Sequence, residues 1–158
     1  MPDQQKTEFS RGDLIKALNE DLSREYQAII AYVVYSQSIK GAQYMNIAGE
    51  LEKHAKEELS HALTVAKHID YLGGKVTATP LSVKVSDKPT DMLRFDLDNE
   101  NDTVRNYRER VRQCESLGEY GIAEDIREIL RQEQEHQSDL ADALGEDVPD
   151  VSKLPKKK

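Results

Sequence analysis

The amino-acid sequence predicts an all-α protein, a four-helix bundle made of two antiparallel helix hairpins joined by a long crossover loop. The first observation is periodicity, since apolar residues recur at alternating intervals of four and three along four segments. The second is a loop-forming stretch, residues 73–89, which begins with two glycines and contains two prolines. The third is length, because 158 residues suit one domain with a substantial core.

The first helix pair lies before this loop. Ser10 stands three positions before Asp13, a spacing typical of a helix N-cap, and the helical pattern then covers about 13–40. Gly41 offers a stop, and a second helix follows over about 44–72. The short connection between these helices predicts that they fold back on each other.

The second pair lies after the loop. Thr90 is a plausible N-cap for a third helix that runs to about residue 117, where Gly118 interrupts the pattern. A fourth helix is predicted over about 120–144 and stops at Gly145. The 73–89 loop, if extended, is long enough to cross the whole bundle and join the two hairpins.

Composition narrows the class of protein. We expect one bundle domain over 10–145, a flexible tail at 1–9 and a flexible basic tail at 146–158. The net charge of −8 opposes nucleic-acid binding over the whole surface and suits a protein that handles cations. No apolar run approaches a membrane span and no signal peptide is recognisable, so we expect a soluble cytoplasmic protein with no membrane partner. The single Cys114 excludes an internal disulfide.

One arrangement of acidic residues and histidine occurs twice. Glu25 is followed 33 positions later by Glu58, which opens a Glu-x-x-His run ending at His61. A second copy lies 75 positions downstream and comprises Glu100, Glu133 and His136. The members fall in the apolar rows of their helices, so we expect them to point into the bundle.

Four carboxylates in an apolar interior would repel one another unless cations neutralise them. Two divalent ions supply the required charge, and carboxylate and imidazole ligands without thiolate suit iron, with manganese as an alternative. We therefore predict two metal ions per subunit, most simply iron that cycles between Fe(II) and Fe(III) and reacts with dioxygen or hydrogen peroxide.

Each of four further residues has two possible interpretations. Tyr32 and Tyr107 repeat with the glutamates, and they either pack in the core or hydrogen-bond a ligand carboxylate. His54 and His68 share the row of His61; we expect core or lumen histidines rather than ligands, with His54 placed to support the site.

The six-residue pattern resembles the di-iron ligand set of ferritin-like helix bundles. Over about residues 13–144 the chain is similar to bacterioferritins, above all in the stretches DMLRFDLDNENDTVRNYRERV and IREILRQEQEH. The resemblance implies one iron held by Glu25 and His61, another by Glu100 and His136, and bridges from the other two glutamates, Glu58 and Glu133. It also implies ferroxidase activity and iron storage in a hollow homo-oligomer.

The chain departs from the bacterioferritin pattern in two places. A haem-ligating methionine follows the glutamate of the first Glu-x-x-His in that family, and here the position is Leu59, so we predict no haem. The family's fifth helix is replaced after Gly145 by a basic stretch with prolines, which favours a 12-subunit cage over a 24-mer.

Self-association has separate support in the first helix. Residues 28–35, AIIAYVVY, are apolar around two helical turns, whereas a bundle needs one apolar stripe. The second apolar side is expected to pack on another subunit. The alternative is burial beneath the crossover loop.

Two other functions compete with a ferroxidase. The first is another di-metal redox enzyme, such as a rubrerythrin-like peroxidase, a manganese catalase or an oxygenase subunit. The second is a scaffold that binds DNA through its C-terminal lysines, Lys153, Lys156, Lys157 and Lys158. Four lysines give a weak, salt-sensitive anchor and the rest of the chain is acidic, so DNA is not an expected partner.

Overall fold

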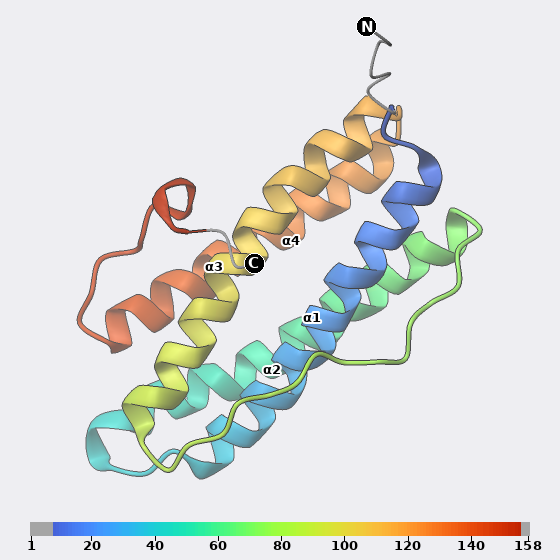
Figure 1. Cartoon of the computed structure of the whole chain (residues 1–158). Helices are drawn as coiled ribbons and strands as arrows, with labels where there is room; N and C mark the ends of the chain where they lie inside the picture. The colour runs from blue at the N-terminus through green and yellow to red at the C-terminus, as the bar shows by residue number, and fades with distance from the viewer. Residues whose placement is uncertain (1–7, 156–158) are drawn as a thin grey trace, which may run out of the picture.

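The computed structural model describes residues 8–155 and consists of four long helices, with no strand in that range (Figure 1). The helices are α1 (Arg11–Ser38), α2 (Met45–Tyr71), α3 (Pro89–Ser116) and α4 (Tyr120–Ala143). Two short 3-10 helices, η1 (Ala42–Tyr44) and η2 (Val151–Lys153), complete the order. α1 packs mainly on α2 and α3 mainly on α4, which confirms the predicted pair of antiparallel hairpins.

The helix starts follow local side-chain chemistry. Ser10 and Asp13 form a reciprocal capping box at the start of α1, as the spacing predicted. The prediction that Thr90 caps the third helix is wrong, because α3 begins at Pro89 and its N-cap is Lys88, two residues before Thr90. Proline suits the first helical position since its φ is already helical and its missing N–H would be unpaired there.

The crossover loop runs along α1 from one end of the bundle to the other (Figure 1). Asn19 bonds the loop at Lys75 and Thr77, and Tyr35, four turns further along α1, donates to the carbonyl of Lys84. The loop does not cover the outer apolar side of α1, where Val33 stays half exposed. The alternative explanation of that apolar surface, burial under the loop, is therefore wrong.

The core has two apolar halves separated by a polar layer. One half includes Leu14, Leu18, Val65, Ile69 and Ile126. The other includes Tyr35, Leu51, Leu93, Leu97 and Leu140. Buried acidic residues and histidines lie between the two clusters and separate them along the bundle.

Part of the segment after α4, where a flexible tail was expected over residues 146–158, contacts α3. Val151 of η2 is 2% exposed, and Arg105 on α3 donates to the backbone carbonyls of Val151 and Leu154. An apolar side chain and two backbone acceptors hold this segment against α3, in a way that its polar composition did not indicate. The last three lysines and most of the N-terminal tail lie outside the described residues.

Among the helices that the structure describes, none combines the length and the apolar character needed to cross a membrane.

A buried ion pair joins α1 to α3 and was not predicted. Arg110 is 5% exposed and donates through Nε to Asp21 at 2.6 Å and through a terminal nitrogen at 3.1 Å. Arg24 also donates to the same carboxylate. The two-pronged contact fixes the relative position of α1 and α3, which carry one glutamate each into the polar layer.

We expect Asp21→Asn to lower the free energy of unfolding by ~3–5 kcal/mol, because Arg110 would keep a buried charge without its counter-ion. Urea unfolding followed by circular dichroism measures the change. Glu109→Gln, which removes the carboxylate of the exposed Arg112–Glu109 pair on the same helix, should cost about 1 kcal/mol or less. Equal losses in the two variants would contradict a structural role for the buried pair.

Candidate metal centre

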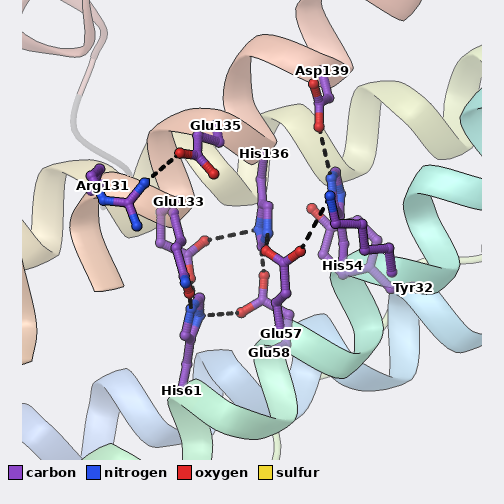
Figure 2. Close-up of polar contacts among 12 residues, drawn as sticks. Tyr32, His54, Glu57, Glu58, His61, Arg131, Glu133, Glu135, His136 and Asp139 are labelled. Carbon is purple, nitrogen blue, oxygen red and sulfur yellow. Dashed lines mark hydrogen bonds and ion pairs between the residues drawn. The ribbon is translucent and has the colours of Figure 1, made fainter. Parts of the chain in front are cut away.

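All four helices contribute a carboxylate to the polar layer between the two apolar clusters. α1 provides Glu25 and α3 provides Glu100, while α2 and α4 each provide a Glu-x-x-His pair. The side chains of this set are each at most 3% exposed: Glu25, Glu58, His61, Glu100, Glu133 and His136. The structure thus gathers all six residues that the repeat singled out, and Figure 2 shows the two Glu-x-x-His pairs facing each other.

The six residues divide into two overlapping groups that could each hold a metal ion. The first comprises Glu25, Glu58, His61 and Glu133, and the second comprises Glu58, Glu100, Glu133 and His136. In each group one ligand atom from every residue lies within 4.8 Å of the others. Glu58 and Glu133 belong to both groups, which is the geometry expected of carboxylates that bridge two ions.

Both histidines direct Nδ1 into the centre. His61 Nδ1 lies 2.7 Å from a Glu133 oxygen, 3.0 Å from Glu58 and 3.7 Å from Glu25. His136 Nδ1 lies 2.9 Å from Glu58, 3.5 Å from Glu133 and 3.6 Å from Glu100. Each ring nitrogen is therefore close to three carboxylates at once, which is more than one N–H can satisfy with good geometry.

Unpaired atoms show that hydrogen bonds do not complete this layer. One oxygen of each of the four glutamates, and Nδ1 of His136, are buried without a hydrogen bond of good geometry, although the atoms of Glu58, Glu133 and His136 lie within ion-pair distance of a partner. Buried polar atoms are normally paired, and leaving one unpaired costs about 1–3 kcal/mol. The concentration of such atoms in one place fits a pair of cations, since carboxylate oxygens and imidazole nitrogen are suitable donors.

Two tyrosines hydrogen-bond the carboxylates of Glu25 and Glu100 across the bundle. Tyr32 on α1 donates to Glu100 on α3 at 2.5 Å, and Tyr107 on α3 donates to Glu25 on α1. The exchange is reciprocal, so each of the two helices orients the other's glutamate. Core packing and a hydrogen bond to a carboxylate were the two alternatives predicted for these tyrosines. The structure shows both, because each ring also packs in an apolar cluster.

The outward nitrogens of the histidines bond two residues that sequence analysis missed. His61 Nε2 lies 2.5 Å from the side-chain oxygen of Gln132, and His136 Nε2 lies 2.9 Å from Glu57. These contacts fix the ring orientations and leave Nδ1 free to face the centre. A signal was present in the sequence, since Glu57 and Gln132 stand 75 positions apart, at the same lag as the ligands.

His54 is buried beside the centre and makes no hydrogen bond to the four glutamates. Its ring stacks on that of His136 with centroids 4.0 Å apart, and Tyr32 meets it edge-on at 5.1 Å. Its Nε2 lies 3.0 Å from Asp139 on α4. Burial lowers the pKa of His54, and the nearby His136 lowers it further.

The pKa values describe how protons balance the charge when no metal is present. Burial lowers the pKa of His61 and of His136, but their bonds to the surrounding carboxylates outweigh burial and raise both well above the usual range. Burial and the neighbouring charge of Glu133 raise the pKa of Glu58 strongly and that of Glu100 to about 7. Burial raises the pKa of Glu133 too, but its hydrogen bonds lower it to about 2. Protons thus occupy positions that cations could take.

Comparison with known proteins agrees with this geometry. A family model described as a ferritin-like domain matches residues 15–147. Among curated proteins, the chain is 26% identical over 130 residues to the bacterioferritin of Desulfovibrio desulfuricans, covering 82% of this chain and 73% of that one. It is 27% identical over 143 residues to the bacterioferritin of Brucella melitensis, covering 85% and 88%.

Solved structures show the same fold. A ferritin-like di-iron carboxylate protein from Bacillus anthracis superposes with a TM-score of 0.82 at 30% identity, covering 85% of this chain and 96% of that one. The bacterioferritin-related dodecameric thioferritin of Bacteroides fragilis superposes with a TM-score of 0.80 at 26% identity, covering 87% of each. The chain therefore belongs to the ferritin-like superfamily of di-iron proteins and is related to the bacterioferritins.

Proposed function

We propose that the protein is a ferroxidase, which oxidises Fe(II) with dioxygen or hydrogen peroxide and stores the ferric product. The observation that carries this proposal is the pair of four-residue groups that share Glu58 and Glu133. Two Fe(II) ions that share two ligands can each give up one electron, and these two electrons, together with two protons from solvent, would reduce dioxygen to hydrogen peroxide or hydrogen peroxide to two water molecules.

The ligands have different tasks in this proposal. Glu25 and His61 would hold one iron, Glu100 and His136 the other, and the two shared glutamates would join them. The bonds from Nε2 of each histidine keep Nδ1 turned inward, and the tyrosine hydroxyls restrain the terminal carboxylates. Restrained ligands on rigid helices keep both positions formed while Fe(II) arrives and Fe(III) leaves.

Iron storage requires a hollow assembly, and we propose a homo-oligomer of twelve subunits. On α1, Ile30, Val33 and Val34 are 41%, 50% and 39% exposed, although apolar residues on a helix normally face a core. The Bacteroides fragilis relative is a dodecamer, which supports this number over 24. A second copy of the chain would cover the apolar side of α1.

We further propose that this assembly carries no haem. Leu59 occupies the position that follows the glutamate of the first Glu-x-x-His, and its side chain is half exposed on α2. Leucine offers no atom that ligates iron, so two such residues facing each other across a subunit contact could not hold a haem group.

Replacing Glu58 by alanine should abolish rapid Fe(II) oxidation, because both ions lose a shared ligand. We expect the fold to remain, since the substitution removes a buried carboxylate that repels three others. Stopped-flow absorbance of ferric iron after aerobic mixing measures the rate, and circular dichroism checks the fold. Glu52→Ala, an exposed change on the same helix, is the matched control.

Oxidation by Glu58→Ala at the wild-type rate would exclude Glu58 from the reaction.

Counting iron per subunit after aerobic loading separates the competing functions. Tens of ferric ions per subunit are expected of a store, whereas peroxide consumption that stops at two bound ions would indicate a peroxidase or catalase.

Metal loading at pH 7 should release protons, about two to four per subunit when two Co(II) ions bind. Both imidazoles hold a proton without metal because their pKa values are raised, and Glu58 and Glu100 contribute further protons since theirs are raised too. Apparent affinity should therefore rise with pH. Titration in unbuffered solution with a pH indicator measures the release, and uptake without proton release would contradict this charge balance.

Val33→Lys should split the oligomer, because it places a charge in the apolar surface of α1. Light scattering after size exclusion gives the mass of the assembly. Val85→Lys, at a residue of the crossover loop that is 75% exposed, serves as control and should leave the assembly intact. An unchanged mass for Val33→Lys would show that this side of α1 does not form a subunit contact.

A further inference from the structure

α2 and α4 are joined by a ladder of polar contacts with a seven-residue spacing. The histidines of α2 at positions 54, 61 and 68 each reach a residue of α4, and their partners are Asp139, Gln132 and Asp125. The partners are also seven residues apart, as antiparallel helices in constant register require. The middle pair belongs to the metal centre, which leaves two His–Asp pairs, one on each side of it.

The two outer pairs differ in burial, since the side chain of His54 is 2% exposed and that of His68 is 13% exposed, and in whether a third ligand residue lies nearby. Near His54 and Asp139 lies a third ligand residue, Glu50, one helical turn before His54 on α2, and one atom of each of the three lies within 4.8 Å of the others. The pair formed by His68 and Asp125 has no such third member among the described residues. The His68–Asp125 pair is therefore a control for the group formed by Glu50, His54 and Asp139, called the His54 group below.

The His54 group lies between solvent and the metal centre. Figure 2 shows Asp139 above His54, with His136 beside it. His54 is 1% exposed and stacks on His136, whereas the Asp139 side chain is 42% exposed. A hollow of about 250 Å³ opens next to the group and is lined by Glu50, Asp139 and the further carboxylate of Asp142. An ion could thus arrive from solvent at the carboxylates of this hollow, one of which, Asp139, contacts the buried imidazole of His54.

The internal repeat adds an independent observation. The six ligands recur at a lag of 75, and so do the tyrosines that bond them. At the same lag, Glu50 corresponds to Asp125, whereas His54 corresponds to Ile129 and Asp139 corresponds to Thr64, neither of which suits a metal. The acidic residue thus recurs in the other half of the chain, but the buried histidine and its aspartate partner do not.

We propose that Glu50, His54 and Asp139 form a third cation site, separate from the two-ion centre. One imidazole and two carboxylates with open positions suit a divalent transition metal such as Fe(II), Co(II) or Zn(II). The site would use Nε2 of His54, the nitrogen that faces Asp139. If the protein is a ferroxidase, a role that rests on the function proposed above, this site supplies Fe(II) to the neighbouring position at His136.

Co(II) alone tests the binding, because air does not readily oxidise it. Isothermal titration of the intact metal-free assembly should give three equivalents per subunit for the wild type and for Asp125→Asn. Asp139→Asn should lose one equivalent or bind it at least tenfold more weakly, and Glu50→Gln should do the same. Both aspartates are changed to the same residue, both face a histidine of α2, and only one belongs to the three-residue group.

Two results would overturn the site: a wild type that binds only two equivalents, or identical isotherms for Asp139→Asn and Asp125→Asn. The double variant Glu58→Ala/Glu133→Ala gives an independent check, since it should lose the two-ion centre and retain one equivalent. Circular dichroism establishes that each variant is folded before titration.

Stopped-flow oxidation with less than one Fe(II) per subunit tests the supply role. Asp139→Asn should be several-fold slower than the wild type, and Asp125→Asn should not. Equal rates would overturn the supply role. If the wild type fails to oxidise Fe(II) while Asp139→Asn still loses one Co(II) equivalent, the ferroxidase proposal fails and the third site stands.

Discussion

Four carboxylates buried among apolar clusters impose the constraint on which the rest of the structure depends. The negative charges of these carboxylates repel one another, and removing each carboxylate from water is costly. The layer therefore needs positive charge at its centre. In the metal-free chain, protonated His61 and His136 supply positive charge. The raised pKa values of Glu58 and Glu100 favour their neutral, protonated forms, which reduces the repulsion further. One oxygen of each glutamate still lacks a hydrogen bond of good geometry, so protons satisfy this layer incompletely.

The bundle surrounds this layer with a near-twofold repeat, and the departures from it are informative. Asp21 and Asp96 stand 75 positions apart and both are buried. Asp21 is paired with Arg110, but the residue 75 positions before Arg110 is Tyr35, which bonds the crossover loop. Asp96 is consequently left with an unpaired oxygen, and burial raises its pKa strongly. The two halves therefore share ligands but not their electrostatic surroundings.

Sequence reasoning succeeded where a residue's role follows from its position along one helix. Glu58 and His61 share a face because they are three residues apart, and the apolar row around them shows that the face is buried. It missed Gln132 and Glu57, although these two repeat at the same lag as the ligands, because their contacts depend on which residue of the opposite helix lies at the same height. It also failed for Val151, because a single apolar residue in a polar segment gives no periodic signal.

The sequence alone determined the helices, the crossover and the set of six inward residues, since helix periodicity and a repeated spacing are local properties that survive without tertiary information. The tertiary structure decided which atoms meet. It selected Nδ1 of each histidine as the inward nitrogen, exchanged the tyrosines between α1 and α3, and placed Glu50 with His54 and Asp139. Those outcomes depend on the rotation and register of helices distant in sequence, which packing fixes across the whole bundle.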